Sequence, residues 1–576
     1  MNLEAILCLC VGSMNVRAAK RQLRCATFIL AFCPVIALAQ VAATATPPSA
    51  PAAAATIDQY IHQAWDTLSR SMTDCNSLID PKLKTAPVLY IPQDIEEPAQ
   101  VAALHSQCNV DVERLPHRIT HIGEVNPRSI KVPGLLYLPN KYVVPGGRFN
   151  EMYGWDSYFI LLGLLRDGRV ELARGMVENF FFEIEHYGAI LNANRTYYLT
   201  RSQPPFLSSM IRDVYEAELS SKSGGAKTAD AWLARAYGYA VRDHNLWLDD
   251  FHRAGDTGLA RYFDLGEGPV PEQEDDSTYY PDVIRWLLSH PDVHTDYLVD
   301  GPDQPNAAQR AELAKTSCDI SVSHVCAHAH VDGRWLSADY YRGDRAMRES
   351  GYDPSFRFGP FSGSTHHNAP ICLNSLLYKY ERDLAWMAEK LGKPDEAKQW
   401  DEQAEARKAA INKYLWNASE GMFFDYDYMA HKQSTYRYLT TFYPLWAGLA
   451  DEQQIKGLEK ALNWFEQPGG LAMSTFNSGT QWDLPYGWAP PTWIALAGLW
   501  KVGDIADARH ISEDFSRTIK TNFDRDHTIR EKYDVVSGSS QLELATGYKT
   551  NEVGFGWSNA AYLKMQQLLA ATGGKK

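Results

Sequence analysis

Residues 373–411 read LNSLLYKYERDLAWMAEKLGKPDEAKQWDEQAEARKAAI, and this stretch decides the predicted fold. Apolar residues recur at helical spacing from Leu373 to Leu391 and again from Ala397 to Ile411. Gly392 follows the first pattern and Pro394 opens the second, and these residue types commonly end and begin helices. The stretch therefore predicts two helices joined as a hairpin.

The same helical periodicity continues through most of the chain from Tyr158 onward, and strand-like alternation is rare. Further helix pairs are predicted at residues 443–449 with 455–464 and at residues 492–500 with 506–519. Helices that recur in twos favour an all-α fold built as a closed ring of helix pairs. Residues 279–344 interrupt this rhythm with prolines, charges and two cysteines, so we expect an insertion or lid over one mouth of the ring.

Long loops lie between the predicted helices and are rich in Gly, Pro, Asn, Trp and Tyr. Loops of this length inside a compact domain are usually functional. They span residues 144–156, 192–206, 351–358, 477–492 and 531–557.

Composition excludes some partners. The chain has 576 residues with 70 acidic and 56 basic side chains, which gives a net charge of -14. No basic stripe follows the N-terminus, so nucleic acid is not an expected partner. We expect a monomer that acts on a small molecule and needs no cofactor.

The first residues have the layout of an exported protein. Basic residues from Arg17 to Arg24 precede a short apolar run that contains Pro34 and ends at Ala37-Leu38-Ala39. This order predicts a cleavable signal peptide at 1–39, and the run is too short to favour a membrane anchor. An Ala/Pro-rich spacer at 40–56 and a single domain at 57–576 then follow. The predicted location is the periplasm, with no membrane contact after signal removal.

Five cysteines remain beyond the predicted signal, an odd number that allows one or two disulfides. Besides Cys75 and Cys108 they are Cys318, Cys326 and Cys372. We favour a Cys318–Cys326 bridge and predict a buried free thiol at Cys372, which adjoins an apolar helical pattern. The alternating run His324, Cys326, His328 and His330 has zinc-ligand residue types, but its spacing lacks separated ligand pairs, so no metal is expected.

The loops place carboxylates beside Trp and Gly, and arginines beside Asn and Gln. Sugars are bound by hydrogen bonds from carboxylate, amide and guanidinium groups, while their apolar faces lie on aromatic rings. Cleavage of a glycosidic bond usually needs two carboxyl groups, one protonated and one ionised. Composition alone does not select that pair.

A resemblance to a known family does select the pair, and two long segments carry this resemblance. Residues 145–158 read PGGRFNEMYGWDSY and residues 481–490 read QWDLPYGWAP, and both resemble the signature segments of the trehalase family of glycoside hydrolases. Four further segments resemble family motifs in family order: NANRTYYLTRSQPP from Asn192, ESGYDPSFRF from Glu349, REKYD from Arg530 and GFGWSN from Gly554. The resemblance covers the chain from about residue 57 onward. It implies an (α/α)6 barrel that hydrolyses α,α-trehalose to two glucose molecules with inversion.

By this resemblance Asp353 would be the general acid and Glu531 the general base. An acid must stay protonated, so we expect burial and nearby carboxylates to raise the pKa of Asp353. Arg530 and Lys532 flank Glu531 and would favour its ionised form. The substrate contacts implied by motif position are Arg148, Trp155, Asp156, Asn192, Arg201, Ser202, Gln203, Glu272 and Gly351. Trp482 and Trp488 would either stack on a glucose ring or pack in the core.

The chain departs from the family pattern in two places. Val270 stands where relatives often have an arginine, and the candidate replacements are Arg261, Arg342 and Arg345. Before GFGWSN a glutamate of the family is missing, and Glu543 or Glu552 is the candidate substitute. Two alternatives stay open at this point: another inverting α-glucosidase on the same barrel, and a sugar-binding protein without turnover.

Overall fold

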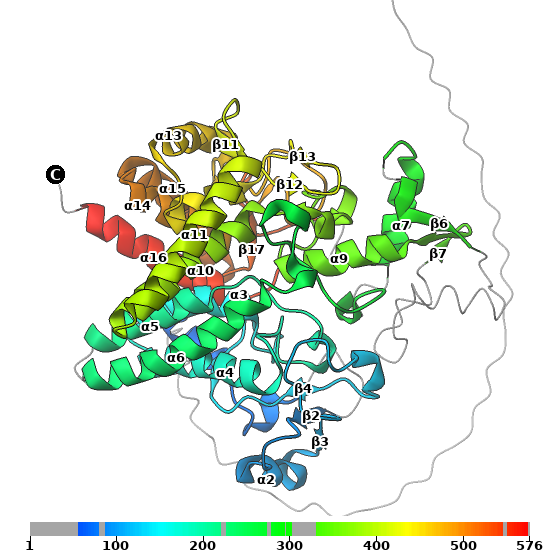
Figure 1. The fold of residues 1–576 in the computed structure, drawn as a ribbon, viewed down its shortest axis with the longest axis vertical. Coiled ribbons are helices and arrows are strands. Elements are labelled where there is room, and N and C mark those ends of the chain that lie inside the picture. Colours follow the sequence, from blue (N-terminus) through cyan, green and yellow to red (C-terminus); the bar gives the residue numbers. More distant parts are fainter. Residues whose placement is uncertain are drawn as a thin grey trace, which may run out of the picture. The chain divides into compact units, whose positions relative to one another are not determined.

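The helix hairpin predicted from residues 373–411 is present in the computed structural model as α10 (Ile371–Lys390) and α11 (Pro394–Tyr414). Lys393 precedes the proline that starts α11, and Gly392 has a φ of 70°, a left-handed conformation that glycine adopts without strain. The two helices pack along each other (Figure 1). This one hairpin contributes many fully buried side chains to the main core.

The structure describes residues 56–79, 87–220, 226–273, 278–293, 295–301, 330–544 and 550–573, which belong to one unit spanning residues 55–576. The predicted signal peptide and all but the last residue of the predicted spacer lie outside these residues. So do Cys318, Cys326, His324 and His328, and with them the favoured disulfide. None of the described helices combines the length and the apolar character needed to span a membrane.

The helices of this unit form a closed ring. Successive contacts run from α3 (Gly154–Arg166) to α5 (Leu207–Ser220), α10, α12 (Tyr443–Ala447), α14 (Ala489–Val502) and α16 (Gly556–Gly573), and α16 packs back on α3. Figure 1 shows this closure where the red α16 lies close to the cyan α3. Gly163 permits it, because a Cβ atom there would lie 2.8 Å from Ala560.

A second set of helices packs outside this ring, each beside a member of the inner set. It comprises α4 (Val170–His186), α6 (Ala226–Leu246), α11, α15 (Ile505–Asp526) and α1 (Ile57–Thr67), whereas α13 (Glu452–Ala461) packs on the short strand β11 (Met422–Phe423). At the start of α13, Asp451 and Gln454 form a reciprocal capping box. The all-α ring of helix pairs predicted from the sequence is therefore confirmed.

Short strands occupy the loops, and they were not predicted. One parallel sheet has the order β3-β2-β4 and joins β2 (Val88–Ile91) to β3 (Asp111–Arg114) and β4 (Leu135–Leu136). The remaining strands pair antiparallel in two- and three-stranded sheets. They are β1 (Ser69–Arg70), β5 (Tyr142–Val143), β6 (Leu298–Asp300), β7 (His330–Val331), β8 (Arg334–Leu336), β9 (Asn368–Ala369), β10 (Trp416–Asn417), β11 (Met422–Phe423), β12 (Tyr426–Asp427), β13 (Lys432–Gln433), β14 (Glu466–Gln467), β15 (Gly470–Leu471), β16 (Tyr486–Trp488) and β17 (Lys532–Asp534).

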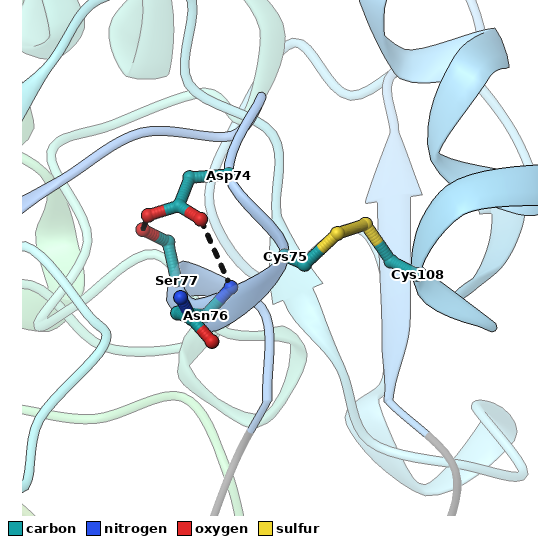
Figure 2. The surroundings of a disulfide bond; sticks show 5 residues. All are labelled: Asp74, Cys75, Asn76, Ser77 and Cys108. Atoms are coloured by element: carbon teal, nitrogen blue, oxygen red, sulfur yellow. Dashed lines mark hydrogen bonds between the residues drawn. A yellow bond between two sulfur atoms is a disulfide. The ribbon is translucent and has the colours of Figure 1, made fainter.

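A disulfide joins Cys75 to Cys108 near the parallel sheet (Figure 2). Cys75 begins a short 3-10 helix whose Asn76 amide donates to Asp74 at 3.1 Å, and Cys108 is the last residue of α2 (Ala99–Cys108). The bridge thus ties α2 to the segment after α1. Cys372 is a buried free thiol, as predicted.

A smaller cluster of buried apolar side chains lies apart from the main core. It includes Val270, residues of α7 (Tyr279–Ser289) and residues of α9 (Ala338–Ser350). The region predicted as an insertion thus holds α7, the β6-β8-β7 sheet and the start of α9 in its described parts.

Candidate active site

The chain leaves α9 directly into the segment that carries Asp353. Gly351 ends this helix with a φ of 80°, and a Cβ atom there would lie 2.8 Å from the ring of Trp155. Both the left-handed backbone and the close contact require glycine. Gly351 therefore shapes the backbone beside Asp353 and packs against Trp155.

Asp353 lies in a polar setting that is only partly open to solvent, with 30% of its side chain exposed. Arg348 donates from Nη1 to Oδ2 of Asp353 at 3.0 Å, and the side-chain amide of Gln481 donates to the Asp353 carbonyl. Burial raises the pKa of Asp353 to about 6, and the negative charge of Glu272 adds to this, while Arg348 and Arg201 oppose it. The carboxyl group can thus hold a proton in mildly acidic conditions.

Glu531 directly precedes β17, and its position is fixed by the pairing of that strand with β16. The register places Lys532 opposite Trp488 and Tyr533 opposite Gly487. The Glu531 carbonyl accepts hydrogen bonds from Trp557 Nε1 at 3.2 Å and from Ser558 Oγ at 3.1 Å. Segments far apart in sequence therefore hold this one residue.

The Glu531 carboxylate is almost fully buried and contacts the buried ammonium group of Lys532, which donates to Oε2 at 2.7 Å. The predicted partnership with Lys532 is therefore present. Arg530 turns elsewhere, because its guanidinium donates to the Asn551 carbonyl at 2.9 Å. Of the two flanking basic residues, Lys532 is therefore the one that contacts the Glu531 carboxylate.

The charges of Asp353 and Glu531 both act on a third carboxyl group, that of Asp156. It lies in the first turn of α3 and is 5% exposed. Burial raises the pKa of Asp156 well above its usual value, and the negative charges of Glu531 and Asp353 raise it further. Asp156 therefore lies within electrostatic range of both Asp353 and Glu531.

Arg201 and Glu272 form an ion pair on the Asp353 side of the site. Arg201 is buried, lies over the ring of Tyr198 and also approaches Asp264 at 3.5 Å. Glu272 is supplied by the short 3-10 helix Pro271–Gln273. The pair presents a guanidinium and a carboxylate in fixed positions, which suits recognition of hydroxyl groups.

Arg148 forms a second pair with Glu552, at 3.1 Å. The backbone of Glu552 also accepts from the Glu531 amide at 3.0 Å, so this glutamate adjoins Glu531. Glu543 is exposed. Of the two candidate substitutes for the missing family glutamate, only Glu552 has this position.

The remaining residues of the RSQPP segment brace the backbone. Gln203 accepts from the Trp155 amide at 2.9 Å, and Ser202 donates from its hydroxyl to the Ile190 carbonyl at 2.7 Å. Asn192 donates long hydrogen bonds of 3.4 Å to the carbonyls of Ser202 and Arg348. Their side chains thereby tie the loops that carry Trp155, Arg201 and Asp353 to one another.

Trp482 and Trp488 stack on each other, with ring centroids 3.7 Å apart and planes 5° from parallel. Trp488 is fully buried, so it packs in the core. Trp482 also contacts Trp155 and Tyr352, and the aromatic residue beside Asp353 is thus part of one continuous wall.

None of the three arginines proposed to replace the one missing at Val270 contacts Asp353. Arg345 donates to the carbonyls of Gly268 and Pro269, Arg261 to those of Phe251 and His366, and Arg342 lies over Phe263. Val270 itself is fully buried.

Arg348 contacts Asp353 instead, and the sequence did not predict this contact. Asp344, one turn earlier on α9, holds Arg348 at 3.4 Å and accepts from the hydroxyl groups of Tyr279 and Tyr280. Its position in the sequence was the available signal, because Arg348 immediately precedes the ESGYDPSFRF segment, on the last turn of the helix that leads to Asp353.

Comparison with known proteins adds a consistent result. Residues 46–570 match the family model described as Trehalase. The chain is 35% identical to a probable trehalase of Eremothecium gossypii over 87% of this chain and 71% of that protein. It is also 35% identical to the cytosolic neutral trehalase of Beauveria bassiana over 88% of this chain and 72% of that protein.

A solved structure gives the same picture. Neutral trehalase Nth1 from Saccharomyces cerevisiae superposes with a TM-score of 0.72 at 32% identity, covering 89% of this chain and 93% of that one. This similarity spans the ring of helix pairs and agrees with the predicted (α/α)6 barrel.

Proposed function

This chain belongs to the trehalase family and hydrolyses trehalose, and we propose that it does so by inversion, with Asp353 as general acid and Glu531 as general base. The observation that carries these roles is the environment of the three carboxyl groups. Asp353 has a raised pKa of about 6, Glu531 is paired with Lys532, and the pKa of Asp156 responds to both. An inverting glycosidase needs one protonated and one ionised carboxyl group on opposite sides of the scissile bond.

In the proposed reaction, Asp353 donates its proton to the glycosidic oxygen as the bond to one anomeric carbon breaks. Arg348 holds Oδ2 of Asp353, which orients the carboxyl group. Glu531 takes a proton from the attacking water on the opposite face of the sugar ring. Separations of about 6.5 to 9.5 Å between the two carboxyl groups leave room for that water in inverting enzymes.

We propose that two ion pairs and the residues around them bind the substrate. Arg201 with Glu272, and Arg148 with Glu552, offer donors and acceptors that are already oriented by each other. Preorganised polar groups bind a sugar with less loss of side-chain freedom. The proposed contacts are Arg148, Trp155, Asp156, Asn192, Arg201, Ser202, Gln203, Glu272 and Gly351.

The predicted periplasmic location is wrong. The similar proteins from Saccharomyces cerevisiae and Beauveria bassiana are named cytosolic neutral trehalases, and this points to the cytosol. Those names do not support the predicted signal peptide either.

The test of the mechanism is proton NMR of the purified enzyme with α,α-trehalose, in which the anomeric signals of glucose are followed as they appear. Inversion at one carbon gives equal initial amounts of α- and β-glucose. Asp353→Asn and Glu531→Gln should each abolish release, whereas Glu543→Gln, at an exposed position, should leave it unchanged. Initial formation of α-glucose alone would contradict inversion, and full activity of either carboxyl variant would contradict its role.

A further inference from the structure

A cluster of two histidines and an aspartate lies at the far end of α9 from the catalytic acid. His366 and His367 belong to the short 3-10 helix η10 (Thr365–His367), which packs on α9, and Asp339 lies in the first turn of α9. Their possible ligand atoms all lie within 4.8 Å of one another. We propose that Asp339, His366 and His367 form a binding site for one divalent transition-metal ion of the zinc class.

The geometry converges on one carboxylate oxygen. Nε2 of His366 lies 3.0 Å from Oδ1 of Asp339, and Nε2 of His367 lies 3.7 Å from the same atom. The two imidazole rings are 3.9 Å apart between centroids. Two imidazole nitrogens with one carboxylate suit zinc, copper or nickel, whereas calcium and magnesium prefer oxygen ligands alone.

A neutral imidazole can carry its proton on either ring nitrogen. Nδ1 of His366 is buried and has no hydrogen-bond partner among the described residues. Transfer of the ring proton from Nε2 to Nδ1 therefore breaks no hydrogen bond at Nδ1 when a metal takes Nε2.

The surroundings hold the ligands and leave one side open. The His366 carbonyl accepts from Arg261 Nη1 and from the Tyr428 hydroxyl, each at 3.0 Å, which fixes the backbone of the short helix. The Asp339 side chain is 45% exposed, whereas that of His366 is 3% exposed. Solvent can therefore supply a fourth ligand on the Asp339 side.

The site is separate from the sugar site. Asp339 lies at the start of α9 and Asp353 follows its end, so roughly 17 Å of helix lies between them at 1.5 Å per residue. In the sequence, Asp353 nevertheless lies between two of the proposed ligands, Asp339 and His366. A bound ion would link the segments on either side of Asp353 and stabilise the fold in proportion to its occupancy.

The experiment uses full-length enzyme without a histidine tag, freed of metal with a chelator. Zn²⁺ binding is measured by calorimetry, and Co²⁺ binding by the visible absorption bands of a tetrahedral nitrogen and oxygen site. We expect one ion per chain and a higher melting temperature with Zn²⁺. Asp339→Asn and His367→Ala, both at positions open to solvent, should weaken binding by more than about tenfold.

Two control variants separate this site from other histidines. His431→Ala removes an exposed histidine, and the double variant His324→Ala/His328→Ala removes the histidine-rich run noted in the sequence. Both should bind Zn²⁺ as the wild type does. The proposal is overturned if the wild type binds no ion, if Asp339→Asn and His367→Ala bind normally while folded by circular dichroism, or if only the double variant loses binding.

Discussion

Arg348 donates to Asp353 from the helix turn that immediately precedes it, with 3.0 Å between Nη1 and Oδ2. The same guanidinium lies 3.4 Å from the buried carboxylate of Asp344. The acid therefore belongs to a chain of charges that alternates in sign along α9. Arg348 therefore helps to orient the carboxyl group and opposes the rise in pKa that burial causes.

The wild-type enzyme should lose activity as the pH rises through about 6. The general acid works only when protonated, and burial raises the pKa of Asp353 to about 6. The measurement is kcat/KM for trehalose from pH 4.5 to 8.5. A profile that stays flat between pH 5 and 8 would argue against Asp353 as the acid.

Arg348→Met should move this alkaline limb to higher pH. The arginine favours the charged form of Asp353, so its loss raises the pKa of the acid, by about one unit if about 1.4 kcal/mol of interaction is lost. We also expect a lower maximal kcat, because the carboxyl group loses its orienting partner. Arg345→Met serves as the control, since Arg345 contacts Asp264 and not Asp353; an equal shift in both variants would assign the effect to general disruption of α9.

Asp156→Asn should stabilise the protein while reducing activity. Burial holds the folded-state pKa of Asp156 well above the 3.8 of an ordinary aspartate. As the pH rises above about 4, Asp156 ionises more easily in the unfolded chain than in the folded protein, so the free energy of unfolding falls. Asparagine does not ionise and avoids this loss. The difference in melting temperature between variant and wild type should therefore grow from pH 4.5 to pH 8, and a difference independent of pH would contradict this account.

Gly351→Ala should destabilise the enzyme more than Gly503→Ala does. Both glycines end helices in the left-handed conformation, with φ of 80° and 93°. A Cβ atom at Gly351 meets the Trp155 ring at 2.8 Å, whereas one at Gly503 meets nothing within 4 Å. Conformational strain costs about 1–2 kcal/mol at either site, and crowding adds about 1–3 kcal/mol at Gly351 alone. Urea unfolding would measure both, and equal losses would show that the ring yields to the methyl group.

Cys75→Ser should lower the free energy of unfolding by about 2–4 kcal/mol, because the disulfide closes a loop between residues 33 apart in sequence. The check is thermal unfolding with and without reductant. The wild type should lose stability in reductant, while Cys75→Ser and Cys108→Ser should match each other and show no further change. A wild type insensitive to reductant would mean that the bridge contributes little.

The sequence predicts the helices well because their patterns are local. Gly392 and Pro394 mark the turn between α10 and α11, and the apolar spacing identifies the buried faces. The described strands escape prediction because each is only two to four residues long and many pair with distant partners, as Val88 does with Asp111. The Cys75–Cys108 bridge escapes for a related reason: spacing alone does not define which cysteines pair.

The site divides in the same way. Motif order points to Asp353 and Glu531, the two residues that we propose as acid and base. Arg348 was missed because its contact with Asp353 depends on the left-handed turn at Gly351, and Glu552 could not be separated from Glu543 without knowing which of them meets Arg148. The sequence supplies the identity of each of these residues, but the direction of its side chain depends on the folded backbone.

The pairing of β16 with β17 limits how this enzyme can be redesigned. Neighbouring residues of a strand face opposite sides of a sheet. One residue inserted within β17 would therefore exchange the two faces of the strand and turn Lys532 away from the Glu531 carboxylate. Insertions and grafted loops are better placed at exposed turns such as Gly503, where no neighbouring atom lies within reach. A library that varies loop length around the barrel should therefore leave the two short strands unchanged.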